Sequence, residues 1–286
     1  MNGPNVRAFF HEPTNSVTYL TWDPATKRAA IIDSVLDFDV RSGRTATHSA
    51  EAIISAARAE GLAVDWILET HVHADHLSAA PFLKRATRAP VVIGEHVRTV
   101  QKTFKEIYNL TDLTPDGRPF DKLVSEGETL ALGELKIEVL HTPGHTPACV
   151  SYLIGDAVFV GDTMFMPDYG TARADFPGGD ARALYRSIQK LLALPDATRV
   201  FLCHDYKAPG RDCFLWETTI GEQRAKNIHL KEMSEGAFVA MREARDQTLS
   251  APALILPAIQ VNMRAGEMPA PESNGVRYLK LPLDKL

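Results

Sequence analysis

Four side chains of types that commonly bind metal ions lie close together in the segment THVHADH. They are His71, His73, Asp75 and His76, and they directly follow the apolar run VDWILE. Residues two apart in an extended segment project to the same side, so we expect His71 and His73 to share one side, while Asp75 and His76 enter from the following turn. Such an arrangement can hold one metal ion or two.

Three further candidate ligands also follow strand-like apolar runs. His145 comes after ELKIEVL in the motif HTPGH, Asp162 comes after DAVFV, and His204 comes after RVFL. A lone histidine more often only hydrogen-bonds to the backbone, but five of the ten histidines share this context with two carboxylates. The pattern therefore indicates a metal site. Imidazole and carboxylate ligands without a cysteine shell suit Zn, Fe(II) or Mn, and a catalytic site keeps positions open for water, oxygen or substrate.

The elements that carry these ligands alternate between strands and helices, which indicates a mixed α/β protein. A hairpin is expected at a sheet edge, and the helix after it is expected to end at Gly61, where a left-handed cap is easy. Two segments, 111–121 and 167–179, are expected to be long surface loops. The hairpin covers 16–23 and 28–34. Further strands are expected at 64–70, 91–94, 134–140, 148–155, 156–162 and 199–204, and helices at 47–61, 76–90 and 180–195.

The composition is that of a globular protein, with 45% hydrophobic and 23% charged residues among 286. A net charge of -5 gives no electrostatic reason to expect nucleic acid or an anionic membrane as a partner. The first residues lack the pattern of a secretory signal, and no window approaches eighteen apolar residues. We therefore expect a cytoplasmic protein.

The three cysteines do not form the paired pattern of a secreted disulfide framework. Cys149 and Cys203 lie in apolar runs and are expected to pack as small hydrophobic residues. No role is assigned to Cys213.

The motifs HVHADH, TPGHT, GDT and HDY, in this order, resemble those of the metallo-β-lactamase superfamily. The resemblance spans most of the chain and implies an αββα four-layer sandwich with metal ions along one edge. Within the superfamily, the chain looks most like the persulfide dioxygenases related to the human ethylmalonic encephalopathy protein, with glyoxalase II as a close relative. This narrower resemblance rests on DYGTARADFPGGD, similar to an Arg-Thr-Asp-Phe loop, and on LPAIQVNMRAGEMP, similar to a Pro-x-Asn-Met-Arg segment.

The dioxygenase resemblance implies one Fe(II) per chain, bound by His71, His145 and Asp162. Two histidines and one carboxylate form an oxygen-activating set with three open positions. The remaining candidates would then orient these ligands through hydrogen bonds, or hold a second metal ion; they are His73, Asp75, His76 and His204.

The same resemblance implies that glutathione persulfide and O2 are the substrates, and that sulfite and glutathione are the products. Glutathione carries two carboxylates, so the pocket is expected to present cations near the iron. The resemblance assigns substrate binding and a catalytic role first to Arg173 and then to Tyr206. Lys207 and Arg211, in the basic loop YKAPGRD, are further substrate-binding candidates, although exposed solvated side chains would fit there equally well.

Two other functions stay open, since all ligands for a binuclear centre are present. One is a hydrolase with two Zn ions that cleaves glutathione thioesters, as glyoxalase II does, or lactones. The other is a module that binds a metal or sulfane sulfur without catalysis.

We expect one metallo-β-lactamase-like domain over residues 1–286, with 221–286 as a helical C-terminal extension. Ile228, Met233, Phe238, Val239 and Met241 are expected to form the packed stripe of this extension. No remaining segment is long enough for a sulfurtransferase domain, so a sulfur-donor protein would act in trans. The sequence leaves the oligomeric state open, and a homo-oligomer would be unsurprising.

Overall fold

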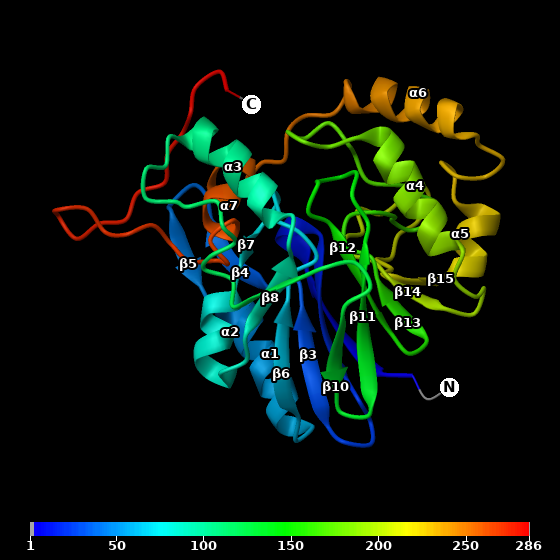
Figure 1. The fold of residues 1–286 in the computed structure, drawn as a ribbon, viewed down its shortest axis with the longest axis horizontal. Coiled ribbons are helices and arrows are strands. Elements are labelled where there is room, and N and C mark those ends of the chain that lie inside the picture. The colour runs from blue at the N-terminus through cyan, green and yellow to red at the C-terminus, as the bar shows by residue number, and fades with distance from the viewer. Residues whose placement is uncertain (1–2, 286) are drawn as a thin grey trace.

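Two six-stranded sheets face each other in the computed structural model, which describes residues 3–285 (Figure 1). In spatial order, the first sheet contains β1 (Asn5–His11), β2 (Ser16–Trp22), β3 (Arg28–Ile32), β6 (Ala63–Leu68), β8 (Val91–Gly94) and β9 (Lys122–Val124). The second contains β10 (Thr129–Leu132), β11 (Leu135–His141), β12 (Val150–Ile154), β13 (Ala157–Phe159), β14 (Arg199–Phe201) and β15 (Glu217–Thr219). A small third sheet is formed by β5 (Arg44–Ala46), β4 (Val35–Asp39) and β7 (Leu77–Ser78).

The helices cover the outer faces of the two large sheets (Figure 1). Three lie on the first sheet: α1 (His48–Ala59), α2 (Ala80–Thr87) and α3 (Val97–Tyr108). Two lie on the second, α4 (Ala181–Leu192) and α5 (Ile220–Lys226), and α6 (Glu235–Asp246) packs on α4. A short 3-10 turn, η1 (Glu12–Thr14), follows β1, and α7 (Ile255–Asn262) packs on β7 and α3.

Apolar side chains fill each interface between layers because central strands of the two sheets, such as β2 and β12, are buried on both faces. Tyr19, Tyr152 and Phe159 belong to the core between the sheets. Ile53 of α1 packs in the outer core of the first sheet, and Leu184 of α4 in that of the second. The expected αββα sandwich is confirmed.

The hairpin is correctly predicted, but its place at a sheet edge is wrong. β2 pairs with β3, yet β1 lies outside β2 and β3 pairs in parallel with β6. The first strand was not recognised in the sequence, so the edge was assigned to the wrong strand. The end of the first long helix is as expected, since Gly61 has a φ of +67°.

Two further expectations need correction. Segment 167–179 is a loop as expected, but only part of it lies at the surface: Asp168, Asp175 and Gly178 are exposed, while Gly170, Thr171, Ala172 and Ala174 are buried. In the C-terminal extension, Phe238 is buried as expected, but Ile228 is 56% exposed because the helix ends at Lys226. The extension is therefore three short helices rather than one long stripe.

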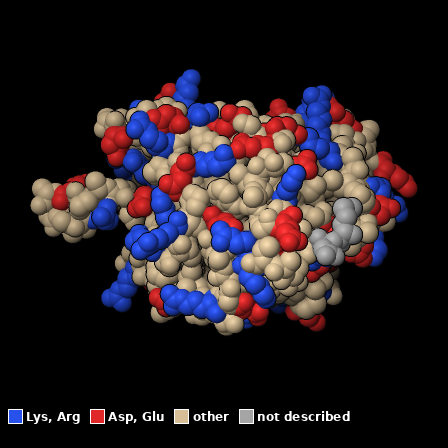
Figure 2. All heavy atoms as spheres, turned by 60° about the horizontal axis from the view of Figure 1, so that its bottom comes forward, with Lys and Arg blue, Asp and Glu red and all other residues tan. Residues whose placement is uncertain are grey.

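In the part of the chain that the structure describes, no helix is long and apolar enough to cross a membrane. Figure 2 shows basic and acidic side chains interspersed over one face of the molecule rather than separated into patches of one sign.

Candidate metal centre

The candidate ligands meet at one edge of the sandwich because parallel strands bring their carboxyl ends to the same side. β3 and β6 run in parallel, and the segment beginning at Glu69 follows β6. β13 and β14 also run in parallel, and they are followed by Asp162 and His204. His145 lies in the connection between β11 and β12.

Backbone hydrogen bonds join the two sheets at this edge. The N–H of Val150 donates to the carbonyl of Thr70 over 2.9 Å, and the N–H of Val17 donates to the carbonyl of Cys203 over 2.8 Å. A Cβ on Gly161 would lie 2.5 Å from Oγ1 of Thr70, so only glycine lets the chain before Asp162 pass this closely.

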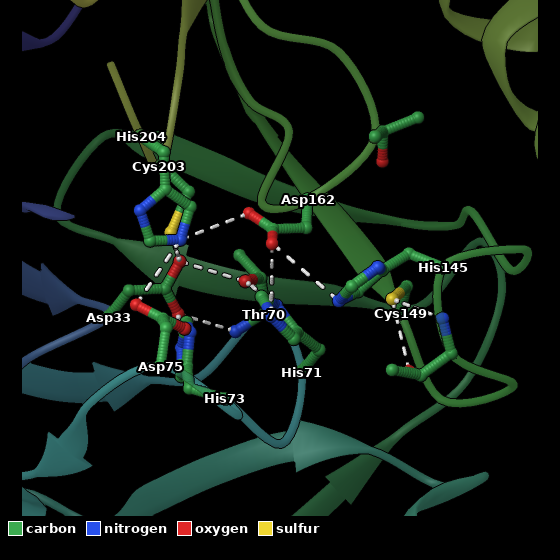
Figure 3. Close-up of polar contacts among 12 residues, drawn as sticks. Asp33, Thr70, His71, His73, Asp75, His145, Cys149, Asp162, Cys203 and His204 are labelled. Carbon is green, nitrogen blue, oxygen red and sulfur yellow. Dashed lines mark hydrogen bonds and ion pairs between the residues drawn. The ribbon is translucent and has the colours of Figure 1, made fainter. Parts of the chain in front are cut away.

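One group of ligand atoms consists of Nε2 of His71, Nε2 of His145 and Oδ2 of Asp162 (Figure 3). Oδ2 lies 3.9 Å from the His71 nitrogen and 3.6 Å from the His145 nitrogen. All three residues are buried. The spacing suits three ligands of one ion at about 2.0–2.2 Å from each.

A second group lies on the other side of the same carboxylate. Nε2 of His204 is 3.3 Å from Oδ1 of Asp162 and 3.5 Å from Oδ2 of Asp75. His73, Asp75 and His76 also bring ligand atoms within 4.8 Å of one another. The two oxygens of Asp162 therefore face different sets of imidazoles, which is the geometry of a bridging ligand.

Five buried polar atoms in these groups have no hydrogen-bond partner: Nε2 of His71, Nδ1 of His73, Nε2 of His76, Oδ1 of Asp162 and Nε2 of His204. Buried polar atoms are nearly always paired, because an unpaired one costs about 1–3 kcal/mol. Five unpaired polar atoms at one place are explained if they bind a metal ion, so the residues present suit a metal cofactor.

Hydrogen bonds to the opposite ring nitrogens fix which nitrogen of each ring is free. Nδ1 of His145 donates to the carbonyl of Arg173 over 2.9 Å, Nδ1 of His204 to Asn15 over 3.1 Å, and Nδ1 of His76 to Leu77 over 3.2 Å. Each ring is left with Nε2 as the lone-pair nitrogen, as expected for metal-binding histidines.

The sequence analysis missed Asp33, which organises two of the candidate ligands. Its Oδ1 lies 3.0 Å from Nε2 of His73, and its Oδ2 accepts from the hydroxyl of Thr70 over 2.8 Å. That hydroxyl accepts in turn from Nδ1 of His71 over 2.9 Å. Asp33 follows the apolar strand β3, so the rule that found the other ligands would also have found it.

Asn262, at the end of α7, was noted in the sequence but given no chemistry. Its Nδ2 donates to the carbonyls of His73 and His76 over 2.8 and 2.7 Å, and its Oδ1 accepts from the N–H of Ser78 over 2.8 Å. The C-terminal extension thus holds the loop that carries four candidate ligands.

Burial and nearby carboxylates set the charge of the rings. Burial lowers the pKa of His76 to about 4 and that of His71 well below its usual range, so both rings are neutral at pH 7 and able to bind a metal. Burial would also lower the pKa of His73, but the Asp33 carboxylate outweighs it and raises that pKa well above its usual range.

A cavity of about 410 Å³ opens onto His145 and Asp162 and is also lined by the candidates Arg173 and Tyr206. The ring of Tyr206 stacks on that of His204 with centroids 5.5 Å apart. The guanidinium of Arg173 is paired with Asp175 over 2.6 Å, and it is the backbone carbonyl of Arg173, not its side chain, that contacts His145.

Lys207 and Arg211 lie outside the residues that line this cavity. The ammonium of Lys207 sits 4.2 Å from the ring centre of Phe214, and the Arg211 guanidinium is held between Asp205 and Asp168. The structure thus gives both side chains other partners.

The cysteines are placed as the sequence indicated. Cys149 and Cys203 are buried, and Cys213 is exposed. Burial raises the pKa of Cys149 to about 12, which keeps the thiol protonated and unreactive at neutral pH.

The family model described as the metallo-β-lactamase superfamily matches residues 12–204. A probable metallo-hydrolase of Burkholderia pseudomallei is 53% identical over 98% of this chain and 99% of its own length. Glyoxylase B2 of Dictyostelium discoideum is 52% identical, covering 92% of this chain and 91% of that protein. A β-lactamase hydrolase-like protein of Xylella fastidiosa is 55% identical over 99% of this chain, which spans only 65% of that protein.

The mitochondrial persulfide dioxygenase ETHE1 of mouse is 28% identical, covering 93% of this chain and 90% of its own. Among solved structures, ETHE1 from Myxococcus xanthus is 31% identical with a TM-score of 0.74, and the match covers 92% of this chain and 100% of that one. The similarity to proteins of this name therefore continues beyond residue 204 into the C-terminal extension.

Proposed function

The chain belongs to the metallo-β-lactamase superfamily, and we propose that it is the member that oxidises glutathione persulfide with O2 to sulfite and glutathione at a mononuclear Fe(II) site. The observation that carries the proposal is the match to the ETHE1 structure, which covers all of that chain and includes most of the C-terminal extension here. Asn262 ties that extension to the ligand loop, so the shared part includes a contact to the site.

The proposed reaction uses one O2 and one water for each glutathione persulfide. The S–S bond breaks, the inner sulfur leaves as the thiol of glutathione, and the outer sulfur becomes sulfite. The outer sulfur loses four electrons, which O2 accepts, and the third oxygen of sulfite comes from water. Fe(II) held by two imidazoles and one carboxylate supplies the redox chemistry.

His71, His145 and Asp162 would hold the iron. The rings are oriented before any metal arrives, because His71 bonds to Thr70 and His145 bonds to the Arg173 carbonyl. Three protein ligands leave the cavity side open to the reactants.

The cavity walls would bind the glutathione part of the substrate. Tyr206 and Arg173 both line it, as do the rings of Phe165 and Phe176. We propose that the phenol of Tyr206 contacts the substrate near the metal, and that the paired Arg173 chiefly shapes the wall beside His145.

The second candidate function is a binuclear zinc hydrolase of glutathione thioesters. It is favoured by the complete second group around Oδ1 of Asp162, with His204 at 3.3 Å and Asp75 in reach of His204. The names of two relatives, which are 53 and 55% identical, also contain the word hydrolase. Zinc ions held by these two groups of residues would supply Lewis-acid chemistry for hydrolysis of the thioester.

One experiment separates the two. The protein is produced with ample iron and with ample zinc, its metal content is measured, and each form is tested for O2 uptake with glutathione persulfide and for hydrolysis of S-lactoylglutathione. One iron per chain, with O2 uptake and stoichiometric sulfite, is the expected result. Two zinc ions per chain with rapid thioester hydrolysis and no O2 uptake would replace the proposal by the hydrolase.

A further inference from the structure

Three arginines line the cavity, and they differ in what their guanidinium groups already bind. Arg173 uses Nε and Nη2 on Asp175, at 2.6 and 2.7 Å, and Nη1 on the carbonyl of Ser250 at 2.7 Å. Arg242 is only 1% exposed and pairs with Asp246 over 2.6 Å. The positive charge of each of these two guanidinium groups is already paired with a carboxylate of the protein.

Arg245 also lines the cavity, but it is exposed and forms no ion pair with any residue in 3–285. It lies on the last turn of α6. The candidate metal ligands His145 and Asp162 are buried and line the same cavity. Arg245 is therefore an uncompensated cation at the rim of a cavity whose floor carries the ligands.

The position of Arg245 is fixed by its neighbours on α6. Arg242 donates to the carbonyl of Thr171 over 3.1 Å, and Asp246 accepts from the N–H of Ala174 over 2.8 Å. These contacts dock the helix onto the segment that carries Arg173, and Figure 1 shows α6 lying over α4 at that end of the molecule. The helix thus holds Arg245 beside the opening rather than leaving it on a mobile surface.

We propose that Arg245 binds a carboxylate of the thiol substrate and so selects anionic low-molecular-weight persulfides. The inference rests on the proposed function and names a residue that the sequence analysis did not consider. The cavity lining also includes the apolar side chains of Phe165, Leu249 and Leu254, which suit the uncharged middle of such a molecule. A guanidinium binds a carboxylate through two parallel hydrogen bonds, a geometry that an ammonium does not reproduce.

The test compares Arg245→Gln and Arg245→Lys with Arg58→Gln. Arg58 is a matched control, because it is an exposed arginine in the last turn of another 12-residue helix and does not line the cavity. Initial rates of O2 uptake are measured with glutathione persulfide and with the neutral persulfide of 2-mercaptoethanol. Calorimetric titration with glutathione gives Kd independently of turnover.

For Arg245→Gln we expect a rise of about tenfold in KM for glutathione persulfide and in Kd for glutathione, with kcat nearly unchanged. KM for the neutral persulfide should stay the same, Arg245→Lys should fall in between, and Arg58→Gln should match the wild type. Wild-type KM and Kd in Arg245→Gln would overturn the role of Arg245 while leaving the dioxygenase intact. Wild-type protein that consumes no O2 with either persulfide would instead overturn the proposed function.

Discussion

Nε2 of His73 lies 3.0 Å from Oδ1 of Asp33, and both residues are buried. The same nitrogen is 3.3 Å from Glu69, so the ring donates toward two carboxylates and turns Nδ1, which has no partner, toward the other candidate ligands. Asp33 also bonds the hydroxyl of Thr70, which holds His71. One carboxylate thus orients His71 and His73, two of the three histidines in the segment THVHADH.

Replacing Asp33 by Asn should weaken metal binding about 10- to 100-fold, because the charged acceptor behind two rings is lost. Metal affinity is measured by competition with a chromophoric chelator. Asp23→Asn is the control: Asp23 is another buried carboxylate, but it accepts from Thr26 and Glu134 in a turn away from the site. Unchanged affinity in Asp33→Asn, or an equal loss in Asp23→Asn, would contradict the assignment.

Removal of single ligands should reveal how many metal ions are bound. With one iron at the His71 group, His145→Ala should lose nearly all bound iron, while His204→Ala should keep it, since His204 faces the other oxygen of Asp162. Elemental analysis after desalting gives the ratio of iron to protein. If the wild type binds two ions and His204→Ala loses one of them, the centre is binuclear.

Asn262→Ala should leave two backbone carbonyls and one N–H of the ligand loop without partners. We therefore expect the unfolding free energy to fall by about 1–3 kcal/mol and metal binding to weaken. Gln101→Ala is the matched control. Gln101 is a buried amide that donates to Met263 and Arg118 and touches no candidate ligand. If the two variants lose the same unfolding free energy and only Asn262→Ala binds metal more weakly, Asn262 positions the ligand loop and does not only pack against it.

Arg173→Ala should keep its metal, because His145 bonds to the backbone carbonyl of Arg173 and not to its side chain. The substitution frees Asp175 and the carbonyl of Ser250 at the cavity wall, so we expect KM for the persulfide to rise several-fold. Metal content and O2-uptake kinetics are measured on the same sample. Loss of the metal would show that the side chain is needed to keep this loop in place.

Burial, with Arg242 adding to it, lowers the pKa of His229 to about 4, and its Nδ1 accepts from the N–H of Thr171 over 3.0 Å. The unfolded chain, with a histidine pKa of about 6.5, therefore binds a proton more readily than the folded one. The contribution of His229 to the unfolding free energy is therefore complete above pH 6.5 and is lost as the pH falls toward 4.

His229→Asn keeps an acceptor near Nδ1 but does not titrate, so the difference in unfolding free energy between wild type and variant should shrink or reverse between pH 7.5 and pH 5. Urea unfolding of both proteins at the two pH values measures it. A difference that is independent of pH would mean that His229 titrates normally in the folded protein.

The sequence by itself indicated which residues could bind a metal ion and, through the resemblance of its motifs, the architecture. Imidazoles and carboxylates directly after apolar strands mark a metal edge, and this information is local, since each ligand sits next to the strand that places it. His71, His145 and Asp162 indeed meet, as do His204 and Asp75. The alternation of strands and helices indicated a mixed α/β protein, and the αββα sandwich was implied by the resemblance of the motifs.

Only the tertiary structure decided which groups surround these ligands and which charges remain free. Asn262 contacts the carbonyl of His73 from 189 residues away, and Asp33 reaches His73 across 40. The sequence shows Arg173 and Arg245 as equal cations, yet packing gives Arg173 a carboxylate partner and leaves Arg245 at the cavity rim without one among the described residues. A charge is neutralised by its neighbours in space, and spacing along the chain does not record them.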